Sequence, residues 1–99
     1  MSRPAYRTEM EIISDILEVL IERGMEGEYI TNIVRNANLS YNIALAKCQK
    51  LINAGLVTMS KEERSRNIFV MTEKGIKFYQ ELRGFEELVH NVRVRSTCR

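Results

Sequence analysis

The sequence has little cysteine and histidine, two residue types that many metal sites and enzymes use. It contains two cysteines, Cys48 and Cys98, and one histidine, His90. Two distant cysteines are too few for a disulfide framework or a zinc cluster, and Cys48 lies at helical spacing among apolar residues, as a buried small side chain does. No glycine-rich phosphate loop and no metal-ligand spacing is present. We therefore expect no catalytic residue, no metal and no cofactor.

Long hydrophobic runs are also missing. No apolar run is long enough for a membrane span, and residues 1–7 lack the apolar stretch of a secretory signal. The 99 residues, 44% of them hydrophobic, fit one compact domain with a modest core. Pro4, the single proline, lies in an expected flexible N-terminal arm at 1–7. We expect a cytoplasmic protein.

The charges are divided unevenly along the chain, although the formal net charge is only +2. Between Thr8 and Glu28 seven acidic residues face a single base, Arg23, which gives −6. Between Arg35 and Val70 six bases face two acids, which gives +4. One acidic side and one basic side suit a molecule that presents one face to phosphates.

The first helix is predicted from a cap and an apolar stripe. Thr8 and Glu11 have the spacing of a capping box. Apolar residues then recur at spacings of three and four as far as Ile21, and Gly24 ends the pattern. The acidic residues fill the opposite face.

Two shorter helices are predicted next, after a turn in which Tyr29 could form a very short strand. We expect Thr31 to cap the second helix and Asn38 to end it in the left-handed conformation. Ser40 is expected to cap the third helix, at about 40–54, which Gly55 ends.

The period then changes to that of strands. Residues 56–59 and 68–71 are short β-rich runs, separated by eight polar or charged residues at 60–67. This pattern predicts two antiparallel strands joined by a long exposed loop, a wing. Thr72 is expected to cap the last helix.

The last helix carries a heptad pattern that favours a homodimer. Its a and d positions are Phe78, Leu82, Phe85, Val89 and Val92. Ile76 and Tyr79 lie off this seam, and we expect them to anchor the helix to its own domain. An apolar helix of this length is marginal alone, so a partner helix is the expected remedy. Whether Cys98 forms an intermolecular disulfide stays open.

From Tyr29 to Phe78 the chain resembles the winged helix-turn-helix domains of bacterial and archaeal transcription regulators. It resembles above all the small archaeal winged-helix proteins that dimerise through a long C-terminal coiled-coil helix. The resemblance is carried by residues 37–41 at the turn, 51–57 after the third helix, and 72–75. It implies an α+β, mainly α fold with three helices, a two-stranded wing and a dimerisation helix. It also implies double-stranded DNA as the ligand.

The expected organisation is an arm at 1–7, a DNA-binding domain at 8–75, a coiled-coil helix at 76–93 and a flexible tail at 94–99. The third helix is predicted to enter the major groove, and the wing to contact the backbone or minor groove. The predicted DNA contacts are Tyr41, Asn42, Lys47, Gln49, Lys50, Lys61, Arg64 and Arg66. For Tyr41 a place in the core is an equal alternative.

Other interpretations stay open at this point. A winged helix can bind another protein, here through the heptad seam or the acidic first helix. A ligand-sensing regulator is a third hypothesis, although no effector site is evident. A specific regulator and an abundant nucleoid-associated protein are not distinguished by these residues.

Overall fold

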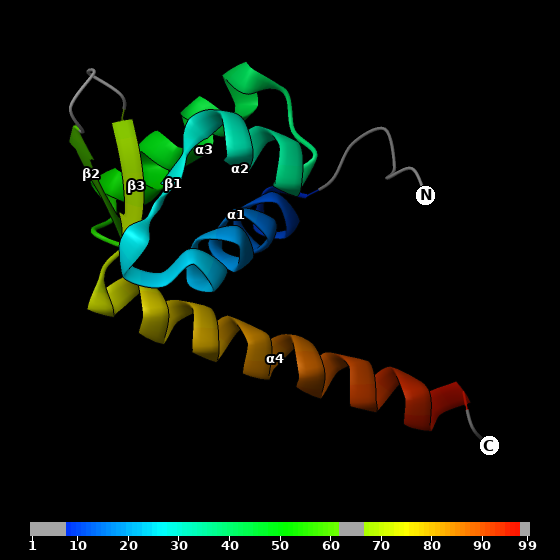
Figure 1. Cartoon of the computed structure of the whole chain (residues 1–99). Helices are drawn as coiled ribbons and strands as arrows, with labels where there is room; N and C mark the ends of the chain where they lie inside the picture. The colour runs from blue at the N-terminus through cyan, green and yellow to red at the C-terminus, as the bar shows by residue number, and fades with distance from the viewer. Residues whose placement is uncertain (1–7, 62–66, 98–99) are drawn as a thin grey trace.

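The computed structural model describes residues 8–61 and 67–97, with side chains through Val92. Within these residues, four α-helices and three strands form a winged helix, and the long final helix extends away from the domain (Figure 1). In chain order the elements are α1 (Glu9–Arg23), the 3₁₀ turn η1 (Gly24–Glu26), β1 (Glu28–Tyr29), α2 (Ile30–Ala37), α3 (Tyr41–Asn53), β2 (Val57–Lys61), β3 (Asn67–Met71) and α4 (Glu73–Thr97). The expected fold class is confirmed.

The capping box predicted for α1 is present. The Thr8 hydroxyl accepts a hydrogen bond from the Glu11 backbone N–H at 3.1 Å. The Glu11 carboxylate accepts one from the Thr8 N–H at 2.9 Å. These bonds satisfy two of the N–H groups that a helix start leaves without an intrahelical partner. The helix then buries Ile16, Leu17 and Leu20 in the core.

The start of α2 differs from the prediction. The cap is Tyr29, without a side-chain capping bond, and Thr31 lies inside the first turn. The cause is tertiary: Tyr29 pairs with Ile68 of β3, which fixes where the chain turns into the helix. The buried Glu28 carboxylate supports this turn by accepting bonds from the Tyr29 N–H at 3.1 Å and from Asn32 Nδ2 at 2.9 Å.

Both predicted signals between α2 and α3 are confirmed. Asn38 ends α2 in the left-handed region, with φ 57° and ψ 57°. The Leu39 N–H then donates to the Val34 carbonyl at 3.0 Å, a bond of the Schellman type. Ser40 caps α3 by accepting from the Ile43 N–H at 3.3 Å. The turn of the helix-turn-helix is therefore set by local sequence.

The predicted hairpin is present, within a sheet of three strands in the order β1-β3-β2. β2 and β3 run antiparallel, in a register from Val57 opposite Met71 to Lys61 opposite Asn67. The two-residue β1 adds to the other edge of β3. Val57 and Phe69 are buried and face the core.

The start of α4 is tightly joined to the end of α3. The Thr72 hydroxyl accepts a bond from the Gly75 N–H at 2.9 Å, as a helix cap does, and donates one to the Gly55 carbonyl at 2.7 Å. A Cβ atom at Gly75 would lie only 2.0 Å from the Leu56 carbonyl oxygen, so only glycine permits this approach. The residues directly after α3 are therefore held to the first turn of α4 by a hydrogen bond and a close backbone approach.

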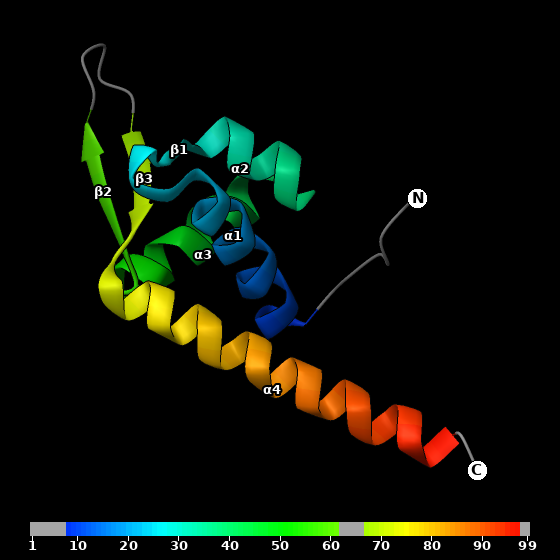
Figure 2. The same ribbon diagram turned by 60° about the horizontal axis from the view of Figure 1, so that its bottom comes forward.

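Beyond this junction α4 extends away from the domain as a straight rod (Figure 2). Its 25 residues correspond to about 37 Å at 1.5 Å per residue. It continues to Thr97, past the predicted end at 93, because neither glycine nor proline interrupts the sequence there. Within the domain it packs against α1 and β3 through the half-buried Phe78 and Tyr79.

Candidate nucleic-acid interface

The helix α3 divides into a buried face and a polar face. Ala44, Cys48 and Leu51 are buried in the core. Asn42 and Gln49 lie on the opposite side and are exposed, as predicted for side chains available to a ligand. For Tyr41 the sequence predicted a DNA contact or a place in the core as equal alternatives. Its side chain is about half exposed.

Asn53 belongs to the same polar face, although it is absent from the predicted set of contacts. The Gln49 side-chain amide donates to the Asn53 side-chain carbonyl at 3.1 Å. Helical spacing could have revealed this residue, because positions 42, 46, 49 and 53 follow one another at steps of four, three and four.

The two lysines of α3 lie on the flank that faces α1, where both meet Glu9. Lys50 Nζ is 2.5 Å from Glu9 Oε2, and Lys47 Nζ is 3.3 Å from the same oxygen. The hydrogen bond from Lys50 and then that from Lys47 hold the pKa of Glu9 below its ordinary value. One carboxylate thus offsets part of the positive charge that the sequence assigned to α3.

The predicted wing is described only in part. Lys61 ends β2 and is exposed, opposite Asn67 in the sheet register. Arg64 and Arg66 fall at 62–66, outside the described residues. Lys61 was expected in the loop at 60–67, but it is instead the last residue of β2, because the pairing of β2 with β3 extends as far as Asn67.

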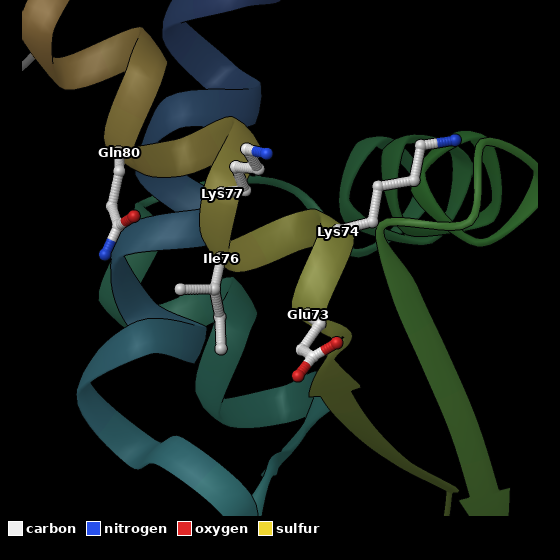
Figure 3. A pocket seen from close by; sticks show the side chains of 5 residues that line it. All are labelled: Glu73, Lys74, Ile76, Lys77 and Gln80. Carbon is white, nitrogen blue, oxygen red and sulfur yellow. The ribbon is translucent and has the colours of Figure 1, made fainter.

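A further lysine, not predicted, lies at the other end of α3. Lys74 Nζ donates to the Ala54 carbonyl at 3.2 Å, where a cation suits the negative end of the helix dipole. Figure 3 shows Lys74 turned away from Glu73 and Ile76, toward the end of α3. Lys74 also borders an open depression of about 580 Å³, which is lined by Glu73, Lys74, Ile76, Lys77 and Gln80. These mixed charges form no recognisable catalytic arrangement.

A second, more apolar cavity of about 350 Å³ lies where α1, η1, β3 and α4 meet. Its lining consists of Leu20, Ile21, Gly24, Met25, Val70, Met71, Glu73 and Ile76. Ile76 was expected to anchor α4 together with Tyr79. Ile76 is instead more than one third exposed and lines this cavity, whereas Tyr79 packs against the core as expected.

The predicted dimer seam consists of an inner and an outer part. Phe78 packs against the core of its own domain, and Leu82 is half-buried. Farther out, Phe85 is 63% exposed and Val92 57%. Leu88, which the heptad assignment omitted, is 60% exposed and lies three residues after Phe85, on the same side. The outer half of α4 therefore carries an exposed apolar row.

The described residues offer little for catalysis or metal binding. Within 8–61 and 67–97 no group of three or more His, Cys, Asp or Glu side chains could hold a metal ion. Burial raises the pKa of the Cys48 thiol to about 11, so its reactive thiolate is scarce at neutral pH. His90 is exposed, and Cys98 lies outside the described part of the chain. None of the described helices combines the length and the hydrophobicity that crossing a membrane requires.

Comparison with known proteins places these features among winged helices. A family model described as winged helix-turn-helix matches residues 6–90. No curated protein matches the sequence. Among solved structures the chain is similar to Sso10a-2, a DNA-binding protein from Sulfolobus solfataricus, with a TM-score of 0.73 and 27% identity, over 94% of this chain and 98% of that one.

Two structures of lower sequence identity share the fold. The first is MepR, a transcription regulator of the Staphylococcus aureus multidrug efflux pump MepA, with a TM-score of 0.75 and 14% identity. The alignment covers 86% of this chain but only 63% of MepR. The second is AF1382 from Archaeoglobus fulgidus, with a TM-score of 0.69 and 20% identity over 83% of this chain and 90% of that one.

Proposed function

Because the chain belongs to the winged helix-turn-helix family, we propose that it binds double-stranded DNA, as a transcription regulator or a chromatin-type protein associated with the nucleoid. The observation that carries this proposal is the exposed polar face of α3, which Ser40 caps and which no other described element covers. The similarity to Sso10a-2 supports it, since that protein binds DNA and aligns over nearly its whole length. The function is one of binding, without catalysis.

In this proposal α3 enters the major groove with its first turn foremost, so that Tyr41 and Asn42 meet base edges early. Gln49 continues the same face farther along the helix. Lys50 is the more exposed of the two lysines, at 61% against 22% for Lys47, and is the better placed to reach a phosphate. The wing, with Lys61, Arg64 and Arg66, follows the backbone or the minor groove.

We further propose that two copies pair through α4. Phe85, Leu88 and Val92 present apolar area to solvent, and burying such side chains contributes about 1.5–3 kcal/mol each. Leu82 and Val89 complete the seam, to which Phe78 adds at its inner end. The DNA-binding domain then comprises 8–75, and the dimerisation helix comprises 76–93 of α4, which itself continues to Thr97. Two linked domains combine modest affinities through a high effective concentration.

The test is a titration of labelled random-sequence duplex with the full chain at several salt concentrations, followed by fluorescence anisotropy. We expect binding that weakens linearly in log Kd against log salt, with a slope that reports how many phosphates the protein neutralises. The absence of binding to random duplex, and to a randomised library at low salt, contradicts the proposal.

The exposed row on α4 also favours a second candidate, a module that binds another protein through Phe85, Leu88 and Val92. Sedimentation equilibrium separates the two. A homodimer occupies the row with a second copy and supports the DNA proposal. A monomer that exposes the row at micromolar concentration supports the protein-interaction module.

A further inference from the structure

The polar face of α3 is an uncharged stripe. Its members, Asn42, Ala46, Gln49 and Asn53, follow one line along the helix, and the three amide side chains among them are exposed. The stripe lies opposite the buried Ala44, Cys48 and Leu51 and therefore points directly away from the core. A groove that receives α3 along its length therefore faces this stripe.

Three of its four members carry primary amides. A side-chain amide of this kind pairs with adenine through two bonds, accepting from N6 and donating to N7 in the major groove. Gln49 and Asn53 are already bonded to each other at 3.1 Å, so the orientation of one amide restricts that of the other. Ala46 adds a methyl group to the stripe, and alanine contacts the thymine methyl favourably.

The lysines of α3 are displaced from this stripe. Lys47 and Lys50 lie on the flank toward α1, and Glu9 accepts a hydrogen bond from each. The helix therefore offers DNA less charge for sequence-independent attraction than its composition indicates, because phosphate contacts supply most non-specific binding. Base contacts then decide a larger share of the affinity of α3.

We propose that the Asn42–Gln49–Asn53 stripe reads adenines in the major groove, which makes this chain a sequence-selective reader of A·T-containing sites and not a uniform coating protein. The inference rests on the proposed function, since it assigns a sequence preference to the same helix. Gln49 is its central residue, because it lies in the middle of the stripe and is bonded to Asn53.

The test begins with selection of bound duplexes from a randomised library by the full chain. Adenine is expected to be enriched at one or two fixed positions in each half-site. The affinity of the selected duplex is then compared with that of a duplex containing 7-deazaadenine at those positions. This base keeps Watson–Crick pairing but lacks the N7 acceptor.

For the unmodified chain we expect 7-deazaadenine to weaken binding about 5-fold at each modified position, the lower end of the range for one bidentate base contact, because the base loses the N7 acceptor but keeps the N6 donor. Gln49→Ala is expected to weaken binding to the selected duplex at least as much, and to remove the effect of 7-deazaadenine at the position that Gln49 contacts. Gln80→Ala makes the same change on α4, far from the stripe, and is expected to leave both values unchanged. Circular dichroism checks that each variant is folded. Asn42→Ala provides a second variant of the stripe for the same two measurements.

The outcomes separate the inference from the function on which it rests. Binding without adenine enrichment, or enrichment with no effect of 7-deazaadenine, overturns the stripe as an adenine reader while DNA binding stands. The absence of binding to every duplex overturns the proposed function, and the inference with it.

Discussion

The Lys50 ammonium group lies 2.5 Å from Oε2 of Glu9, a residue 41 positions earlier in the chain, and Lys47 shares the same oxygen at 3.3 Å. The carboxylate comes from the acidic α1, and the lysines come from the helix proposed to meet DNA. A phosphate that approaches Lys50 must therefore compete with a carboxylate that is already in place.

Removing this competitor is expected to strengthen DNA binding. Glu9→Gln deletes the negative charge and leaves both lysines available to phosphates. We expect affinity for random duplex to rise several-fold, and the salt slope to steepen by up to about 0.9 for each additional phosphate that a lysine neutralises. Anisotropy titrations at four salt concentrations measure both quantities.

Glu22→Gln is the matched control, because it removes the same charge from an exposed position at the far end of α1. An equal increase in affinity for both variants would show that only the total charge of α1 matters, and not the contact with Lys50.

The same pair gives a dependence on pH. Hydrogen bonds from Lys50 and Lys47 lower the pKa of Glu9 from its ordinary value of 4.5. Because the folded pKa is the lower one, the stabilisation by this pair is present above about pH 4.5 and is lost as the pH falls through the depressed pKa. A carboxyl NMR titration is expected to show the pKa of Glu9 below 4.5 in the unmodified chain.

Lys50→Gln is expected to raise that pKa more than Lys47→Gln does, since the Lys50 hydrogen bond is its largest cause. Identical titration curves for all three proteins would mean that neither contact persists in solution.

Two glycines of α4 are expected to respond in opposite ways to alanine. A Cβ at Gly75 meets the Leu56 carbonyl oxygen at 2.0 Å, so Gly75→Ala is expected to destabilise the fold by about 2 kcal/mol. A Cβ at Gly84 meets nothing within 4 Å, and Gly84→Ala is expected to stabilise the helix by about 1 kcal/mol. Urea unfolding at one fixed protein concentration measures both.

The exposed row of α4 predicts the response of the dimer. Leu88→Asp places a charge in the middle of the proposed seam and is expected to weaken dimerisation at least tenfold, about 1.4 kcal/mol. His90→Asp adds a negative charge off the row and is expected to leave the dimer intact. Sedimentation equilibrium gives both constants, and equal effects would argue against pairing through this row.

Local signals in the sequence predicted much of the fold. Thr8, Ser40 and Thr72 cap the helices for which they were proposed, and Asn38 has the left-handed conformation expected of it. These features depend on bonds within a few residues, so the linear sequence is enough to find them. The antiparallel hairpin was equally visible, because the hydrophobic period changes abruptly after Gly55.

What the sequence could not provide depends on contacts between distant segments. The start of α2 is set by pairing of Tyr29 with β3, so the better local cap, Thr31, is not used. The meeting of Glu9 with Lys50 requires the packing of α1 on α3.

The junction at Thr72 couples the orientation of α4 to that of α3. Since Thr72 and Gly75 hold the first turn of α4 against Gly55 and Leu56, directly after α3, we expect a rotation of α4 to move α3 with it. In a dimer joined through α4, a shift of one residue in the pairing changes the helix offset by about 1.5 Å and its facing direction by about 100°. The register in which two α4 helices pair would thus determine the distance between the two α3 helices, and with it the spacing of two half-sites on DNA.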